Sequence, residues 1–373
     1  MSRQLHIAWD NSLAGRNRAG TGVYASGLLG QLTTAPDLKL EVFDGPSRPG
    51  EHGGVLARRI QNARSLLWTH YYLPRLLAGE NFDLLHSPAF IAPLRCPCPS
   101  VVTVHDLTFV MFPQHFERRW RLYLTWIMPR VLRSASAVIC VSQQTKTDLL
   151  RYYTISPDKV HVVYNGIDHA RFHPGATLDV NWARGVGIRG RYLLHVGTLS
   201  YRKNIKTLLL AVAQLRSNGK WTDRQVVLAG SEIPALPGAA EIYETIQTLG
   251  LARDVILAGR VPDEHLPGLY AHASTLVMPS LYEGFGLPVL EGMAAGTPVV
   301  TSDASSLAEI AGDAAMFFPA QDEAALAAAI VEVVENHSVA EEFRRKGLAW
   351  VRQFSWQRAA LETIRIYRSV AST

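Results

Sequence analysis

Cysteine is scarce in this sequence, with only Cys96, Cys98 and Cys140 among 373 residues. An odd number of thiols makes no disulfide framework, and Cys96-Pro97-Cys98 lacks the spacing of a zinc or redox motif. Long apolar runs are missing as well, since none approaches the roughly 18–20 uncharged residues that span a bilayer. The apolar segment 5–9 is too short for the core of a signal peptide. We therefore expect a cytoplasmic protein without a membrane-spanning helix.

Several catalytic signatures are also absent. The sequence holds no GxxxxGKS/T, HExxH, GxSxG or CxxC motif, which argues against a P-loop NTPase, a zinc hydrolase and a serine hydrolase. It also lacks the DxD pair by which many single-domain sugar-nucleotide transferases chelate a metal. Cations and a helix end can stabilise a leaving diphosphate without Mg²⁺. We expect neither a metal nor another cofactor.

The composition is that of a globular protein, with 48% hydrophobic and 18% charged residues. A length of 373 residues favours two domains, since one domain usually holds about 100–200 residues. The net charge of +5 is uneven, because residues 1–170 carry 18 Lys and Arg against 12 Asp and Glu, whereas residues 171–373 carry 19 against 20. Nucleic acid, an anionic membrane or a phosphate-bearing substrate would each suit the basic half. The chain lacks the motifs of nucleic-acid binders, so we do not expect nucleic acid as a partner.

Short aliphatic segments alternate with longer amphipathic ones, a pattern that predicts parallel sheets with helices on both faces. The expected strands are 5–9, 39–43, 84–86, 100–105, 137–141 and 160–164, followed by 192–196, 225–229, 255–258, 275–278 and 298–301. The expected helices are 23–31, 55–78, 116–133 and 143–152, followed by 204–217, 240–249, 263–273, 288–296, 324–336 and 356–370.

Turn-forming residues crowd between residues 165 and 190 and divide this pattern into two doubly wound, Rossmann-like α/β domains. We assign residues 1–170 and 354–373 to the first domain, and residues 171–353 to the second. The last helix has no strand after it, so we expect it to pack back on the first domain. Ligands of such sheets bind beyond the carboxyl ends of the strands, which places the expected site in an interdomain cleft.

The segment 279–291 carries the most chemistry, since it follows an expected strand and enters a helix at a proline. Gly284 and Gly286 leave room for backbone amides and the helix N-terminus to approach an anion, for which phosphate is the natural choice. Glu283 and Glu291 suit hydroxyl groups, because an ionised carboxylate accepts two hydrogen bonds from a diol. A phosphate-binding turn together with two carboxylates that accept hydrogen bonds from diols predicts a binding site for a sugar nucleotide.

Three other segments would add to this site. Adjacent Arg202 and Lys203 follow the first strand of the second domain and would neutralise a diphosphate. Gly22 lies in a Gly-Thr-Gly turn after Asp10, which is incomplete as a dinucleotide fingerprint but suits a loop that closes over a phosphate. His105 ends an expected strand, where it would reach a substrate hydroxyl. Each feature alone also has a purely structural explanation, and only their combination favours a binding site.

These segments resemble the retaining glycosyltransferases of family 4 (group 1), and their motifs are closest to those of bacterial O-antigen and exopolysaccharide mannosyltransferases. The resemblance covers nearly the whole chain. It rests on the Glu-x7-Glu spacing of Glu283 and Glu291 and on the segments 105–113, 163–168, 202–204, 294–300 and 305–309. It implies the GT-B fold and a sugar nucleotide as the donor, with GDP-mannose as the leading candidate. The implied acceptor is a glycan or polyprenyl-linked sugar of cell-surface polysaccharide synthesis.

Carried over residue by residue, the resemblance implies a role for each member of the candidate site. Glu291 would bind the ribose hydroxyls, and Glu283 the hexose 3- and 4-hydroxyls. Arg202 and Lys203 would bind the diphosphate. The other implied contacts are those of Gly22, Gly284, Phe285, Gly286 and Leu287 near the phosphates, Val261 at the base, and His105 near the 6-hydroxyl of the transferred sugar.

Two other functions stay open at this point. A GT-B epimerase of sugar nucleotides would consume the donor without an acceptor. A non-catalytic module would bind the donor without turning it over. Donor turnover with and without an acceptor distinguishes these functions from a glycosyltransferase.

Arginines stand beside aromatic residues in two expected helices of the basic domain, 55–78 and 116–133. Such a combination suits the headgroup region of an anionic membrane. The alternative is that the aromatic side chains pack inward and the arginines form an ordinary solvated face. The first possibility predicts peripheral association with the inner face of the membrane.

Overall fold

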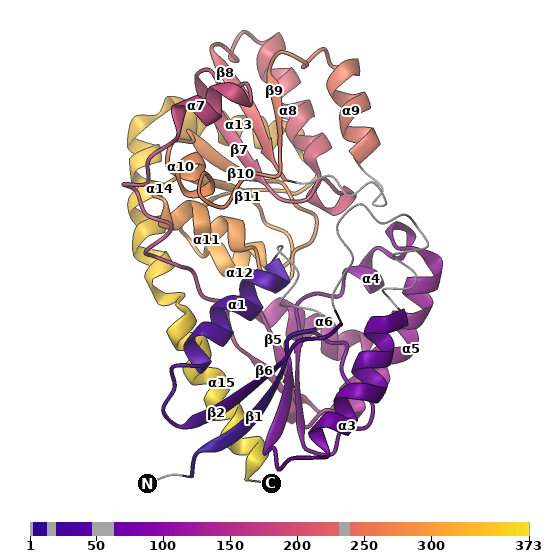
Figure 1. The fold of residues 1–373 in the computed structure, drawn as a ribbon. Coiled ribbons are helices and arrows are strands. Elements are labelled where there is room, and N and C mark those ends of the chain that lie inside the picture. The colour runs from indigo at the N-terminus through magenta and orange to yellow at the C-terminus, as the bar shows by residue number, and fades with distance from the viewer. Residues whose placement is uncertain (1–2, 13–19, 47–62, 231–238, 373) are drawn as a thin grey trace. The chain divides into compact units, whose positions relative to one another are not determined.

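The computed structural model describes residues 3–12, 20–46, 63–230 and 239–372. The chain forms two compact units (Figure 1). Unit 1 contains residues Met1–Pro113, Glu117–Gly166 and Phe354–Thr373, and unit 2 contains Gln114–Phe116 and Ile167–Gln353. Among the described residues, no helix is both long enough and apolar enough to cross a membrane.

Unit 1 is built on a parallel sheet with the strand order β2-β1-β3-β4-β5-β6. Its strands are β1 (Leu5–Asp10), β2 (Leu38–Phe43), β3 (Leu84–Ser87), β4 (Ser100–Val104), β5 (Ala137–Cys140) and β6 (Val160–Val162). Every residue of β3, β4 and β5 is buried, as expected where helices cover both faces of a parallel sheet. The surrounding helical segments are α1 (Gly20–Leu32), the π-helical turn η1 (Trp68–Tyr72), α3 (Leu73–Leu77), α4 (Thr108–Met111), α5 (Arg118–Ser134), α6 (Gln143–Tyr152) and α15 (Trp356–Ala371).

Unit 2 repeats this layout with the strand order β12-β11-β10-β7-β8-β9. Its strands are β7 (Arg191–Val196), β8 (Arg224–Ala229), β9 (Val255–Gly259), β10 (Thr275–Met278), β11 (Val299–Ser302) and β12 (Met316–Phe318). Its helices are α7 (Val180–Gly185), α8 (Ile205–Ser217), α9 (Ala239–Thr248), α10 (Leu266–Ala271), α11 (Leu287–Ala294), α12 (Leu307–Ala311), α13 (Glu323–Glu335) and α14 (His337–Trp350). The core lies between the sheet and helices α8 and α13, where Leu208, Val212, Leu326 and Ile330 are buried.

The alternation of strands and helices predicted from the sequence is confirmed, and each expected strand ends within two residues of its predicted bounds. Several details differ. The turn-rich segment 165–190 contains α7, which begins where the Asp179 carboxylate accepts hydrogen bonds from the amides of Asn181 and Trp182. The three-residue strand β12 and the helices α4, α12 and α14 were not predicted. The helix expected at 55–78 is described only from residue 63, and its first part lies outside the described residues.

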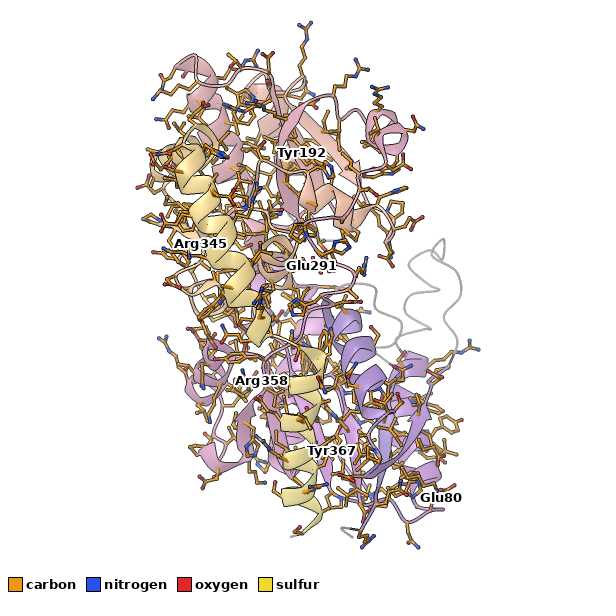
Figure 2. All side chains as sticks on the ribbon, turned by 90° about the vertical axis from the view of Figure 1, so that its left-hand side faces the viewer. Glu80, Tyr192, Glu291, Arg345, Arg358 and Tyr367 are labelled. Carbon is orange, nitrogen blue, oxygen red and sulfur yellow. The ribbon has the colours of Figure 1, made fainter. Side chains whose placement is uncertain are left out.

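Helix α15 belongs to unit 1, where it packs against α1. Its residue Tyr367, labelled in Figure 2, is buried and hydrogen-bonds to Nδ1 of His86 on β3 at 2.5 Å. The other ring nitrogen of His86 lies 2.9 Å from the hydroxyl of Thr103, which in turn lies 2.9 Å from that of Tyr24. Burial lowers the pKa of His86 to about 3, so the ring is neutral and can donate from one nitrogen and accept at the other. This buried series of hydrogen bonds connects α1 and α15 to the sheet.

Close packing between α1 and α15 predicts opposite effects for two substitutions in the same helix. A Cβ atom at Gly27 would lie 2.3 Å from Cε2 of Trp356, so Gly27→Ala should displace that ring and lower the free energy of unfolding by about 1–3 kcal/mol. At Gly30 no atom of the described residues lies within 4 Å of such an atom. Gly30→Ala should therefore raise stability by about 0.5–1 kcal/mol, because alanine favours a helix. Urea unfolding of both variants checks this pair, and equal effects would contradict the packing.

Candidate active site

The charged residues of the candidate site lie in the segments that follow two neighbouring strands of unit 2. Strands β7 and β10 are hydrogen-bonded to each other and run parallel, so their carboxyl ends meet at one edge of the sheet. A single turn of 3-10 helix (Tyr201–Lys203) follows β7, and the loop 279–286 follows β10 and enters α11. Arg202 and Lys203 therefore face the loop that carries Glu283.

Glu283 binds both cations. Its Oε1 lies 2.5 Å from Nζ of Lys203, and its Oε2 lies 2.7 Å from Nη1 of Arg202. The hydroxyl of Ser280 donates a further hydrogen bond to Oε1 at 2.7 Å. Burial raises the pKa of Glu283, but Arg202, Lys203 and these hydrogen bonds outweigh it and lower the pKa to about 2. The carboxylate is thus ionised throughout the physiological range.

Serine hydroxyls fix the loop that carries Glu283. Ser305 donates to the carbonyl oxygen of Glu283 at 2.7 Å, and the Ser306 hydroxyl lies 2.9 Å from the same oxygen. Ser302 donates to the carbonyl oxygen of Ser280 at 2.6 Å. Ser302 is the last residue of β11, the strand beside β10, and Ser305 and Ser306 follow it, so the end of one strand anchors the loop of the next.

The turn into α11 requires a glycine. Gly286 has a φ of 103°, a conformation that L residues rarely adopt, and a Cβ atom there would lie 2.9 Å from Cδ2 of Leu307. Gly284, Phe285 and Leu287 surround this turn, and Phe285 and Leu287 are buried. The first amides of α11 come three to four residues after Glu283, which contacts both cations, and a helix N-terminus there would suit an anion.

Lys203 lies in a tight, mostly buried pocket, with its side chain 6% exposed. A Cβ atom at Gly197 would lie 2.8 Å from Cε of Lys203, so the glycine makes room for the lysine. Asn204 then takes a left-handed conformation and donates to the carbonyl oxygens of Pro279 and Ala320 at 3.0 and 2.6 Å. Burial and the nearby Lys203 lower the pKa of His195 to about 4, so this ring adds no charge to the pocket.

Glu291 lies on α11 and is 8% exposed. The hydroxyl of Tyr270, which is fully buried, donates to its Oε2 at 2.6 Å. Tyr270 was not predicted as part of the site. No pattern in the sequence indicates the pairing, because the two residues are 21 positions apart and meet only through the packing of α10 on α11.

The remaining predicted residues belong to both units, and each is described within its own unit. Val261 is buried just after β9, in unit 2. His105 and Gly22 belong to unit 1. His105 follows β4, its Nε2 lies 2.8 Å from the carbonyl oxygen of Pro88, and burial lowers its pKa. Gly22 was expected in a loop, but it lies in the first turn of α1, which begins three residues earlier than predicted.

Comparison with known proteins identifies relatives along nearly the whole chain. The family model described as glycosyl transferases group 1 matches residues 185–350, and the model of glycosyltransferase family 4 matches residues 32–171. The O-antigen chain mannosyltransferase B of Escherichia coli is 31% identical, covering 94% of this chain and 96% of its own. The alpha-maltose-1-phosphate synthase of Mycolicibacterium smegmatis is 29% identical, covering 95% and 96%. Sucrose-phosphate synthase from Thermosynechococcus elongatus has a similar structure, with a TM-score of 0.79, 23% identity and 99% of both chains covered. The expected GT-B fold is confirmed.

Proposed function

The chain belongs to the group 1 glycosyltransferases of family 4, and we propose that it is a retaining, metal-independent hexosyltransferase. The proposed reaction moves mannose from GDP-mannose to a glycan or polyprenyl-linked acceptor in cell-surface polysaccharide synthesis. The observation that carries the proposal is the contact of Glu283 with Arg202 and Lys203 at the carboxyl end of the sheet. The choice of mannose is supported by the similarity to a protein named as a mannosyltransferase.

In the proposed donor complex, the diphosphate competes with Glu283 for the two cations. Arg202 and Lys203 turn to the phosphate oxygens, together with the first amides of α11 near Gly286 and Leu287. The Glu283 carboxylate, which is ionised, is then available to the 3- and 4-hydroxyls of the hexose. We assign the ribose hydroxyls to Glu291.

Three further residues complete the proposed donor contacts. The backbone of Val261 would contact the base, and that of Gly22 the diphosphate. His105 would accept a hydrogen bond from the 6-hydroxyl through Nδ1, because its Nε2 faces the Pro88 carbonyl and must carry the proton there.

The proposed transfer needs no enzyme carboxylate as base. The bond between the anomeric carbon and the diphosphate oxygen breaks while Arg202 and Lys203 stabilise the developing charge. The acceptor hydroxyl forms its bond to the anomeric carbon on the face that the diphosphate leaves. Its proton passes to the departing phosphate oxygen, so the configuration is retained and the charges balance.

A donor panel tests the proposal. GDP-mannose, UDP-glucose and dTDP-rhamnose are compared by thermal shift, since a ligand stabilises the fold by RT ln(1 + [L]/Kd) and the true donor should raise Tm most. Transfer to lipid-linked acceptors is then followed with and without EDTA, and we expect equal rates. Activity that EDTA abolishes and Mg²⁺ restores contradicts metal independence. Donor consumed without acceptor indicates an epimerase, and binding without turnover indicates a non-catalytic module.

An arginine–aromatic patch on unit 1 supports a membrane-bound acceptor. We define it as the half-exposed residues Leu67, Tyr71, Tyr72, Leu76, Leu122 and Trp126 with the neighbouring Arg75 and Arg130. The guanidinium of Arg75 lies 3.4 Å from the ring centre of Tyr71, and that of Arg130 lies 4.3 Å from that of Trp126. A contact of 3.0 Å between His70 and the Tyr123 hydroxyl joins the two helical segments. Arg58 and Arg59, part of the same expected helix, lie outside the described residues.

We propose that this patch lies in the headgroup region of the inner face of an anionic membrane. The patch aromatics are exposed rather than packed inward, and paired arginines suit anionic headgroups. The protein should co-sediment with anionic vesicles at low salt and much less with neutral ones. Trp126→Ala with Arg130→Gln should weaken binding by about fivefold or more, since one surface cation contributes about 1 kcal/mol.

The control for this prediction is a second arginine–aromatic pair on unit 1. Arg151 lies over the Tyr152 ring on α6, outside the patch, with 5.7 Å between the guanidinium and the ring centre. Tyr152→Ala with Arg151→Gln should leave vesicle binding unchanged. Equal binding to neutral and anionic vesicles, or equal losses in the two double variants, would exclude the patch as the membrane contact.

A further inference from the structure

The buried contact between Tyr270 and Glu291 has the geometry of a strong hydrogen bond. The Tyr270 hydroxyl donates to Glu291 Oε2 at 2.6 Å, which is typical of a hydroxyl bound to an ionised carboxylate. Tyr270 has no exposed surface, and Glu291 is 8% exposed. A carboxylate accepts about four hydrogen bonds, so one from Tyr270 leaves capacity for both hydroxyls of a ribose.

Helix α10 is fixed firmly enough to orient its tyrosine. The hydroxyl of Thr297 donates to the carbonyl oxygen of Tyr270 at 2.6 Å, and the Phe172 ring meets the Tyr270 ring edge to face at 5.7 Å. Gly268 packs so tightly that a Cβ atom there would lie 2.1 Å from the carbonyl oxygen of Thr177. A rigid partner of this kind holds a binding group in one orientation.

Because of its surroundings, the Glu291 carboxyl group stays ionised only with help from its hydrogen-bonding and charged partners. Burial raises the pKa of Glu291, and the acidic Asp263 adds to the rise. The Tyr270 hydrogen bond lowers that pKa, as do Arg171 and Lys203. Arg171 is itself engaged by Asp263, whose carbonyl oxygen accepts from its Nη2 at 2.8 Å. Burial raises the pKa of Tyr270 well above 10, so its hydroxyl keeps the proton that it donates.

We infer that Tyr270 is a positioning residue for the donor, which acts through Glu291 by holding its carboxylate ionised and aimed at the ribose diol. The inference rests on the proposed function, because that function assigns the ribose to Glu291. Tyr270 does not touch the reacting atoms, so it should affect the binding of the nucleotide and leave the transfer step unchanged.

The test compares Tyr270→Phe with Tyr192→Phe. Tyr192, labelled with Glu291 in Figure 2, is 2% exposed and donates to the carbonyl oxygen of Leu269 at 2.7 Å, so its variant loses a buried hydroxyl beside Tyr270 without touching Glu291. Dissociation constants of GDP, or of UDP if the wild type prefers it, are measured by calorimetry between pH 5 and 8. Tyr270→Phe should weaken binding about tenfold, the scale of a hydrogen bond to a charged group, and raise the donor KM with kcat unchanged.

The pH profile gives a readout that a merely structural role would not change. Loss of the donated hydrogen bond raises the pKa of Glu291 further, so binding by Tyr270→Phe should fall at a higher pH than in the wild type as the solution is acidified. The 2′-deoxy nucleotide, which cannot present the diol, should bind to wild type and Tyr270→Phe with nearly equal affinity. Tyr192→Phe should follow the wild type in both experiments.

Two results would overturn the inference in distinguishable ways. If Glu291→Gln weakens nucleotide binding while Tyr270→Phe matches Tyr192→Phe in affinity and pH profile, the inference fails and the proposed function stands. If Glu291→Gln leaves binding unchanged, the assignment of the ribose fails, and the inference fails with it.

Discussion

Replacing Lys203 with alanine should lower kcat by roughly 10²–10³, the scale of losing one preorganised group that stabilises transition-state charge. In the proposed reaction this ammonium neutralises the leaving diphosphate. Its pocket, formed beside Gly197, holds it in place before the donor arrives. Steady-state rates with saturating donor and acceptor measure the effect.

Lys206 provides the matched control, since it lies on α8 one turn beyond Lys203 and pairs with Glu241 at the surface. Lys206→Ala removes an equal charge and should leave kcat unchanged. A Lys203→Ala enzyme that turns over at the wild-type rate would remove Lys203 from the mechanism. Equal losses in both variants would point to net charge rather than to a specific contact.

Replacing Glu283 with glutamine should lower the free energy of unfolding by about 3–5 kcal/mol, the typical cost of leaving a buried charge without its partner. The Glu283 and Lys203 side chains are 9% and 6% exposed, so water cannot replace the lost contact. Urea unfolding measures the change. The comparison is Glu241→Gln, which removes the surface partner of Lys206 and should leave stability unaltered.

The ion pair between Glu283 and Lys203 also makes the free energy of unfolding depend on pH. Because the pKa of Glu283 is about 2 in the folded protein and lies higher in the unfolded chain, its contribution is present in full above the unfolded value. It is lost as the pH falls from there toward about 2. Wild type should therefore lose stability more steeply than Glu283→Gln below pH 4.5, the ordinary value for glutamate. Parallel pH profiles for the two proteins would show that the ion pair does not stabilise the fold.

The layout of both sheets could be predicted because buried parallel strands are short aliphatic runs between amphipathic helices. Strand β12 was not predicted because its three residues, Met316–Phe318, are too few to show the alternation of side chains along a strand. Helix α7 was not predicted because glycines surround it in the sequence, although Asp179 is a recognisable N-cap residue. These short elements were thus missed for lack of a pattern in the sequence. Helix α14 is longer, with 14 residues, and its N-cap is Asn336, the residue at which the preceding helix was expected to end.

The candidate site was predictable where chemistry and local spacing coincide. The charge of Glu283, Arg202 and Lys203 beside turns predicts a site, and the structure brings all three residues into contact. Ser280 and Tyr270 carry no charge at neutral pH, and their roles come from partners that only the fold supplies. The roles of His105, Gly22 and Val261 stay predictions.

The composition of unit 1 also has a consequence for synthesis on the ribosome. Apart from residues 114–116, all of unit 2 is translated between the two parts of unit 1. When residue 353 has been added, unit 2 is complete, whereas unit 1 still lacks Trp356 beside Gly27 and the Tyr367 hydroxyl for His86. The chain of unit 2 is therefore complete before that of unit 1, although unit 1 begins first. A chain that stops before α15 lacks the apolar side chains that this helix buries, so we expect such a fragment to aggregate.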